Sequence, residues 1–188
     1  MLKLAGIIAL CIAMAVAGVA YYAGMFDPLE ITEEQCGPFR LMYREYRGPY
    51  KAVRLMMNNV YRYARDTLHL KTETGFAVFY DDPQSRADML RSISGVIIDD
   101  SLKSLPPPYK TGTFRRTEAV VGRFRLRSFF SYATGSYKFY EGLSRFTAAQ
   151  KINRSGPVME IYEPSHRSLR FIWPRDNTVP SVPLFSGH

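Results

Sequence analysis

The chain begins with one unbroken apolar stretch, and only after it do polar and apolar positions start to alternate. Leu4–Gly24 contains 21 residues and no charge. Folded as a helix, this stretch is about 31 Å long, which is close to the hydrocarbon thickness of a bilayer. Tyr21 and Tyr22 lie where an interfacial aromatic belt falls. The pattern predicts a transmembrane anchor over residues 1–25.

A cleavable signal peptide is the alternative interpretation of this stretch. Ala15-Val16-Ala17 has the small-residue pattern of a cleavage site. The apolar core of a signal peptide usually runs for only about 7–15 residues, however, and this one is longer. The length therefore favours an uncleaved anchor.

From Gly37 onwards, segments with strand and helix periodicity alternate, and their order repeats once. Each half predicts a strand, a Gly-x-Tyr turn, a helix, and a glycine followed by two strands. The turns are Gly48-Pro49-Tyr50 and Gly135-Ser136-Tyr137, so a strand is expected to run up to Tyr132 in the second half. The elements are expected at 40–50, 53–64, 75–83 and 89–98, and again at 123–132, 140–149, 156–164 and 168–173.

This order predicts an α+β fold, in which a duplicated β-α-β-β unit forms two pseudo-symmetric modules after the transmembrane helix. Similar halves that face each other leave a groove between them, and such clefts are favoured ligand sites. The expected segments are an acidic connector at 26–36, a domain at 37–174 with halves at about 37–103 and 113–174, a proline-rich link at 104–112 and an extended tail at 175–188.

Composition excludes several classes of protein. Hydrophobic residues make up 46% of the 188 residues, which excludes a globally disordered chain. Two cysteines cannot form a disulfide framework, and Cys36 is expected to be a free thiol because Cys11 lies in the apolar stretch. Three histidines without a Cys-x-x-Cys motif predict no metal site. The lack of nucleophile and phosphate-loop motifs predicts no catalytic residues and no cofactor.

The formal net charge of +8 raises the question of an anionic partner. Arg123, Arg125 and Arg127 alternate with apolar residues and are predicted to share one strand face. They could meet phosphates, but a solvated strand face is the simpler interpretation. No nucleic-acid-binding motif accompanies them, so we predict no direct nucleic-acid site.

Glu160 is the most informative candidate for a binding residue. On its predicted strand, Val158, Glu160 and Tyr162 share one face, and the aliphatic side chains between them are expected to meet the helix. Tyr80 holds the place of Tyr162 in the first half. A carboxylate framed by aromatic rings suits an organic cation, through Coulomb attraction and cation–π contact. The alternatives are an ion pair with an arginine of a neighbouring strand and a carboxylate that is simply solvated.

Three runs of residues resemble the GyrI-like domain family. They are Leu41–Tyr50, Phe79–Pro83 and Met159–Tyr162, and the resemblance covers about residues 37–174. It implies a duplicated β-α-β-β unit with a ligand groove between its halves. In multidrug-binding relatives a groove glutamate meets cationic, aromatic ligands, and Glu160 matches that position. The predicted ligand-binding residues are therefore Glu160, Tyr162, Tyr80 and Val158.

The anchor and the domain together are similar to the testis-expressed, membrane-anchored ER-phagy receptor family. The similarity implies a single-pass protein of the endoplasmic reticulum membrane with a cytosolic domain. It also implies roles in autophagy (reticulophagy) and in the repair of DNA–protein crosslinks, with the p97 AAA ATPase as a partner. Residues 1–188 do not include the long acidic tail that carries the autophagy motif of that family, so direct tethering to autophagosomes is not expected of them.

The sequence thus predicts a non-enzymatic binding or adaptor protein that is held in the bilayer through Leu4–Gly24. Its groove takes a protein partner or a small amphiphilic ligand. One alternative is a sensor of cationic or amphiphilic small molecules, or a hydrolase that uses Glu160. Another is a luminal or extracytoplasmic domain, because Lys3 alone precedes the apolar stretch. The glycosylation sequon at Asn153 would matter only in that case.

Overall fold

The structure is a computed structural model that describes residues 2–81, 85–99, 102, 104–152 and 156–175. The helices are α1 (Leu2–Tyr22), α2 (Val53–Arg62) and α3 (Phe130–Ala149). A short 3₁₀ segment (Tyr50–Ala52) precedes α2, and a π turn (Tyr63–Thr67) follows it. The strands are β1 (Glu30–Cys36), β2 (Phe39–Arg47), β3 (Gly75–Phe79), β4 (Arg91–Ile98), β5 (Lys110–Phe114), β6 (Thr117–Arg125), β7 (Val158–Glu163) and β8 (Ser168–Pro174).

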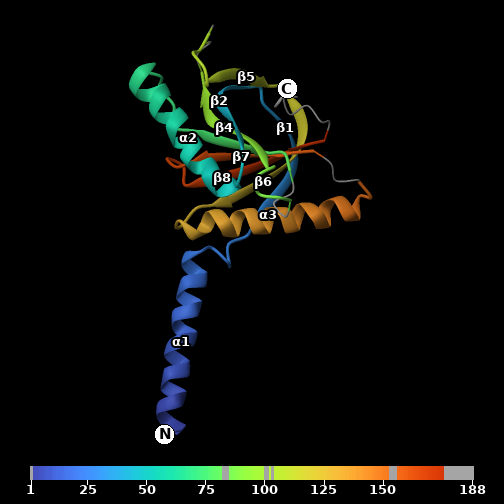
Figure 1. Ribbon diagram of the computed structural model, residues 1–188. Coiled ribbons are helices and arrows are strands. Elements are labelled where there is room, and N and C mark those ends of the chain that lie inside the picture. The colour runs from blue at the N-terminus through green and yellow to red at the C-terminus, as the bar shows by residue number, and fades with distance from the viewer. Residues whose placement is uncertain (1, 82–84, 100–101, 103, 153–155, 176–188) are drawn as a thin grey trace.

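Helix α1 extends away from the rest of the chain (Figure 1). Among the described helices, only this one is long and apolar enough to cross a membrane, over Leu4–Tyr22. Its end is set by Gly24, whose φ of 76° lies in the left-handed region that favours glycine. A Cβ at this position would lie 3.0 Å from Cζ of Phe124. The chain therefore turns at the end of α1 in direct contact with the domain.

The strands form one antiparallel sheet, in the order β1-β6-β8-β7-β3-β4-β2-β5. Along the chain, residues 30–98 follow the order strand, strand, helix, strand, strand, and residues 110–174 follow the same order. Together with the helices, this antiparallel sheet confirms the α+β class. The pairing of β3 with β7 lies at the middle of the sheet, where residues from the two stretches meet.

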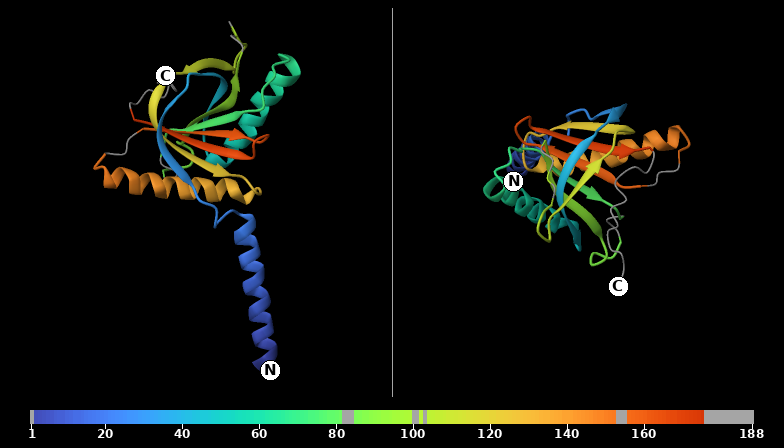
Figure 2. Two further views of the ribbon diagram at one scale, coloured as in Figure 1. Left: turned by 180° about the vertical axis from the view of Figure 1, so that it is seen from behind. Right: turned by 90° about the horizontal axis from the view of Figure 1, so that it is seen from above.

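Two short connections require the sheet to curve. β1 and β2 lie near opposite ends of the strand order, yet only Gly37 and Pro38 separate them in the chain. The same holds for β5 and β6, which only Arg115 and Arg116 separate. A connection of this length spans at most about 11 Å, so the two edges of the sheet must approach each other. Figure 2 shows the resulting curl from behind and from above.

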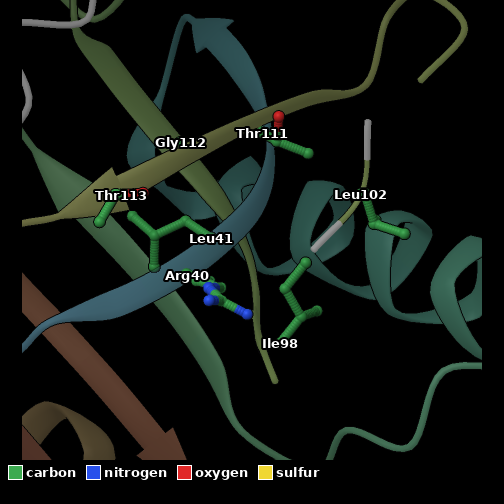
Figure 3. A pocket seen from close by; sticks show the side chains of 7 residues that line it. All are labelled: Arg40, Leu41, Ile98, Leu102, Thr111, Gly112 and Thr113. Carbon is green, nitrogen blue, oxygen red and sulfur yellow. The ribbon is translucent and has the colours of Figure 1, made fainter. Parts of the chain in front are cut away.

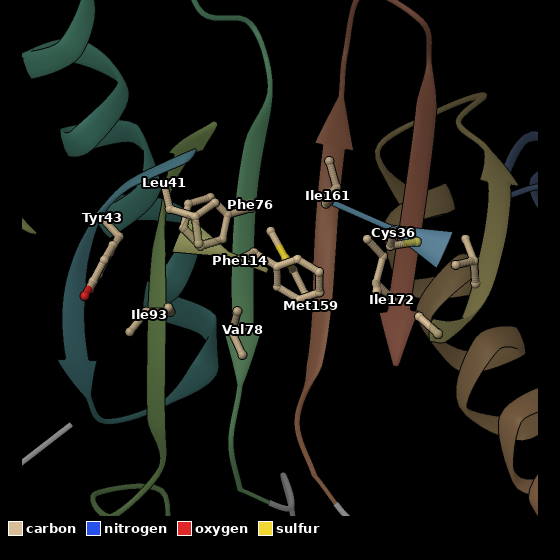
Figure 4. Packing of buried hydrophobic residues seen from close by; sticks show 12 residues of the cluster. Cys36, Leu41, Tyr43, Phe76, Val78, Ile93, Phe114, Met159, Ile161 and Ile172 are labelled. Atoms are coloured by element: carbon tan, nitrogen blue, oxygen red, sulfur yellow. The ribbon is translucent and has the colours of Figure 1, made fainter. Parts of the chain in front are cut away.

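The inner face of the curved sheet encloses an apolar core (Figure 4), which we call the inner core. It contains the buried Cys36 as a free thiol, as expected, and burial raises the pKa of that thiol to about 11. Side chains from β3, β4, β7 and β8 meet there with side chains from both edges of the sheet. The residues are Cys36, Leu41, Tyr43, Phe76, Val78, Ile93, Phe114, Ala119, Val121, Met159, Ile161 and Ile172.

Helices α2 and α3 cover the outer face of the same sheet. α3 packs its buried side chains Phe139 and Leu143 in one cluster with Phe171 of β8. α2 packs Val60 in a second cluster with Val96 of β4. The sheet is therefore buried on both faces, with the inner core on one face and the two helix-covered clusters on the other.

Two stretches that we expected to be connectors contain strands. Glu30–Cys36, within the expected acidic connector at 26–36, form β1 and pair with β6. Two of its acidic side chains are ion-paired, because Glu33 lies beside Arg175 and Glu34 beside Arg123. The residues at 110–112, within the expected link at 104–112, begin β5 and pair with β2.

The boundary between β6 and α3 also differs from the expectation. β6 ends at Arg125 and α3 begins at Phe130, so Gly135-Ser136-Tyr137 lies inside a helix and does not follow a strand. The reason is steric: a Cβ on Gly135 would lie 2.8 Å from Cδ1 of Phe124. The glycine lets α3 approach the sheet closely. Asn153 and residues 176–188 of the expected tail lie outside the described residues.

Candidate ligand-binding site

Glu160 lies at the middle of the sheet, on the outer face and beneath α3. On β7 it is paired with Ala77 of β3 on one side and with Phe171 of β8 on the other. Ser136 reaches it from α3. The Glu160 residue is only 6% exposed. A carboxyl group has thus been placed between a sheet and a helix at a position that normally holds an apolar side chain.

Two hydroxyl groups contact this carboxyl group. Tyr162 donates a hydrogen bond of 2.7 Å to Oε2 of Glu160, and Ser136 donates a longer one of 3.4 Å to Oε1. Burial raises the pKa of Glu160 to about 7, and the two hydrogen bonds only partly oppose that effect. Burial also raises the pKa of Tyr162 well above its ordinary range, so Tyr162 remains a hydrogen-bond donor at neutral pH.

Within the described part of the chain, Glu160 has no basic partner. Among the described residues, no arginine or lysine side chain contributes to its pKa, so the ion pair that we considered as an alternative is not formed. The native chain holds a proton on Glu160 between pH 4.5, its ordinary pKa, and about 7, whereas the unfolded chain has lost it. The contribution of Glu160 to stability is therefore greatest at low pH and falls as the pH rises towards 7.

Aromatic rings surround the carboxyl group. Phe171, its neighbour on β8, stacks on Phe139 of α3 with ring centroids 4.6 Å apart. The half-buried rings of Tyr132 and Tyr162 lie 6.0 Å apart on the other side. Rings around an uncompensated carboxylate attract an organic cation, because the ring faces have a negative electrostatic potential and the carboxylate has a negative charge.

The four predicted site residues do not lie together. Val158, Glu160 and Tyr162 share the outer face of β7, as strand alternation predicts. Tyr80, which follows β3, packs against the inner core on the opposite face of the sheet. Tyr80 is therefore not a neighbour of Glu160.

The expectation that the aliphatic face of β7 meets the helix was wrong. Met159 and Ile161 point into the inner core (Figure 4). Val158 packs in the cluster with α3, and Glu160 accepts a hydrogen bond from Ser136 of that helix. Both faces of this sheet are buried, so the apolar face of a strand does not identify the side on which a helix lies.

The surroundings of Tyr80 contain a second carboxylate. Burial raises the pKa of Tyr80 far above its ordinary range, and Tyr43 and Glu45, both on β2, raise it further. The Tyr80 hydroxyl group is buried and has no hydrogen-bond partner among the described residues. Glu45, unlike Glu160, has a counter-charge: Nζ of Lys110 lies 2.8 Å from its Oε1. This cluster is therefore less suited to capturing a cation.

A surface pocket of about 170 Å³ lies elsewhere, where β2, β4 and β5 meet (Figure 3). Its lining includes one charged side chain, Arg40, which donates a hydrogen bond to the carbonyl of Asp99, and no acidic side chain. It does not suit a cation. Among the described residues, no group of three or more His, Cys, Asp or Glu side chains could hold a metal ion.

Sequence reasoning missed the residues that α3 contributes to the site. Ser136 was interpreted as part of a turn, and Tyr132 as the end of a strand, because Gly135 suggested a break. The helical spacing of Tyr132 and Ser136, four residues apart, was the available signal. The arginines that we considered for phosphate binding are partly occupied, since Arg123 bonds to Glu34 and Arg127 to Asp27.

Comparisons with known proteins show similarity of structure rather than of sequence. No protein-family model matches this chain, and no curated protein matches it. The cryo-EM structure of an EcmrR–DNA complex in EcmrR-RPo is similar with a TM-score of 0.58 and 8% identity, covering 92% of this chain and 68% of that one. The crystal structure of the EcmrR C-terminal domain has a TM-score of 0.58 and 9% identity, covering 78% and 96%. SAV2435 bound to tetraphenylphosphonium has a TM-score of 0.50 and 10% identity, covering 77% and 93%.

At these identities, the similarity shows the fold alone. It supports the GyrI-like fold that the sequence indicates. These structural similarities do not test a role of this chain in ER-phagy, in p97 binding or in DNA repair. Those roles therefore stay predictions from the sequence resemblance.

Proposed function

We propose that this chain is a membrane-anchored, non-enzymatic binding protein whose ligand is a small lipophilic organic cation held by Glu160. The observation that carries the proposal is a buried carboxyl group that no basic side chain among the described residues compensates. An unpaired charge in a low-dielectric site costs several kcal/mol of free energy, on the order of the effective penalty for burying an ion. Such a carboxyl group therefore either keeps its proton or binds a cation.

The chemistry of the surroundings favours an aromatic cation over a metal ion. Tyr132, Tyr162 and Phe171 present rings around one carboxylate, whereas hard metal ions require several oxygen ligands. The similar protein SAV2435 binds tetraphenylphosphonium, which is a permanent, aromatic, lipophilic cation. That ligand is therefore the appropriate probe for this chain.

A ligand reaches Glu160 by displacing the rings that cover it. Tyr132 and Tyr162 are half-buried, their rings lie 6.0 Å apart, and the hydroxyl group of Tyr162 donates to Glu160. The hydrogen bond from Ser136 is long at 3.4 Å and therefore weak, so little free energy is lost when α3 moves outward and breaks it. We infer that the first turns of α3 move when the cation enters.

The position of Glu160 agrees with a duplicated origin of the domain. If β1–β4 and β5–β8 are copies of one unit, the strand order reads the same from both ends, and β3 and β7 are the equivalent strands at the seam. We propose that the ligand binds at this seam between the two units. The anchor is α1, and its assignment to the endoplasmic reticulum with a cytosolic domain follows the sequence resemblance.

Replacing Glu160 with glutamine should strongly weaken the binding of tetraphenylphosphonium. The change keeps the size of the side chain and one of its two acceptor oxygens but removes the charge, so affinity should fall at least about tenfold. Isothermal titration calorimetry on the full chain in lipid nanodiscs measures this effect, with empty nanodiscs subtracted to correct for partitioning into lipid.

Glu163→Gln is the matched control, because Glu163 lies on the same strand and is already paired with Arg170. It should bind the probe like the parent chain. Equal binding by the Glu160→Gln variant and the parent would remove Glu160 from the site.

A further inference from the structure

Exposed aromatic side chains gather where α1 joins the domain. Phe26 is 72% exposed, Phe129 64%, Phe130 60% and Tyr137 65%. We call these residues the aromatic patch. Phe26 follows α1, and the others belong to the first half of α3 and to the turn before it. Large apolar side chains gathered at one place on a surface are typical of an interaction site.

The patch lies on the side of the domain from which α1 extends. α3 runs across the end of α1, with the sheet on its other side, and the views in Figures 1 and 2 agree on this. The buried side chains of α3 face the sheet, so Phe130 and Tyr137, which are exposed, face away from it. If α1 crosses a bilayer, the patch faces the surface of that bilayer.

The segment after α1 is attached firmly to α3 and its preceding turn. Arg127 makes two hydrogen bonds of 2.6 Å to the carboxylate of Asp27 and holds the pKa of that group below its usual range. Lys138 donates to the carbonyls of Met25 and Asp27, at 2.7 and 2.5 Å. Ser128 donates to the carbonyl of Tyr22 at 2.8 Å. The domain is therefore held close to the end of α1.

The outward face of α3 changes character along its length. The first half carries Phe130 and Tyr137, whereas the second half carries the ion pair of Glu141 with Arg145. Beside the apolar half, the guanidinium of Arg54 lies 5.0 Å from the centre of the Phe129 ring. Aromatic side chains next to an arginine match the interfacial zone of a membrane with anionic headgroups.

We propose that the aromatic patch inserts into the headgroup zone of the bilayer that α1 crosses, so that the domain rests on the membrane. This proposal depends on the proposed role of α1 as an anchor. Phe26 follows that helix, Ser128 and Lys138 bond to its end and to the segment after it, and the side chains of the patch are of the types that favour the interface.

The arrangement also connects the bilayer with Glu160. The Phe129 ring lies 6.3 Å from that of Tyr132, which lies 6.0 Å from that of Tyr162, whose hydroxyl group donates to Glu160. A lipophilic cation dissolved in the headgroup zone would meet these rings in order. The bilayer is then the source from which the site is filled.

A fluorescent label placed on the patch tests the docking. An NBD dye is attached to Ala133→Cys, which is exposed between Phe130 and Tyr137, in a full chain that also carries Cys11→Ser. Cys36 is buried and its thiol has a raised pKa, so it stays unlabelled. In vesicles of phosphatidylcholine and phosphatidylserine, the dye at position 133 should be blue-shifted and quenched several-fold by nitroxide-labelled lipids. A dye at the exposed Thr113→Cys on β5, at the end of the domain away from α1, should not be quenched (Figure 1).

The outcomes separate docking from anchoring. The triple variant Phe129→Ser, Phe130→Ser, Tyr137→Ser should lose the quenching at position 133 while the chain still floats with the vesicles. Flotation of the parent chain without quenching at position 133 would overturn the docking and leave the anchor intact. A blue shift without quenching by lipid would also overturn it, because the patch would then be covered by a second copy of the chain. Loss of flotation would contradict the anchor itself.

Discussion

Replacing Gly95 with alanine should prevent the domain from folding stably. Gly95 lies in β4, opposite Tyr43 of β2, and an added Cβ would lie 1.9 Å from the carbonyl oxygen of Met42 and 2.7 Å from Cα of Tyr43. Both are backbone atoms, so the clash is relieved only if β2 separates from β4. We expect a loss of more than about 3 kcal/mol, beyond ordinary overpacking and a large part of the stability of a typical domain.

Urea unfolding of the full chain in detergent micelles, followed by Trp173 fluorescence, measures this loss. Trp173 is the sole tryptophan of the sequence and is buried in the cluster between α3 and the sheet. Gly112→Ala is the matched control, because its added Cβ meets a side-chain atom of Tyr43 at 3.2 Å. That variant should lose about 1 kcal/mol or less. Similar losses for both variants would mean that β2 and β4 are not in the register described here.

Phe139→Ala should cause the second large loss. The ring is fully buried, stacks on Phe171 at an interplanar angle of 7°, and lies so close to β6 that a Cβ on Gly122 would be 2.3 Å from its Cδ2. Removing it leaves a cavity between α3 and the sheet, and truncating a buried phenylalanine typically costs about 3–5 kcal/mol. The same urea titration measures the difference.

Phe146→Ala provides the comparison on the same helix. Phe146 is only partly buried at the edge of the cluster, so its loss should be clearly smaller. If the two variants lost equal stability, α3 would not be packed on the sheet through Phe139.

The fold was predictable to the extent that each element carried its own pattern. The apolar run of α1 and the strands β3 and β7 stand out because each is bounded by glycine, proline or charge. β1 was missed because it is an edge strand with three glutamates, and composition suggested a connector. The start of α3 was missed because a glycine at position 135 locally suggests a turn. A glycine is needed there because the Phe124 ring, which is distant in sequence, packs against it.

The candidate site was half predictable. Glu160 and Tyr162 emerged from strand alternation and the rarity of a carboxylate in an apolar strand, and the structure brings them together. The side of the sheet on which α3 lies is a tertiary property, so Tyr80 was wrongly grouped with them, and Ser136 and Tyr132 were not recognised. Which face each helix covers depends on the packing of the whole sheet.

The central claim is that a cation replaces the proton of Glu160, and the affinity for tetraphenylphosphonium as a function of pH tests it most directly. The probe does not titrate, and the pKa of Glu160 in the free chain is about 7. Affinity should therefore rise about tenfold per pH unit below about pH 7 and level off above it, with one proton released per cation bound at low pH. Calorimetry in buffers of different ionisation enthalpy counts that proton. Affinity that does not change with pH, with no proton released, would contradict the account.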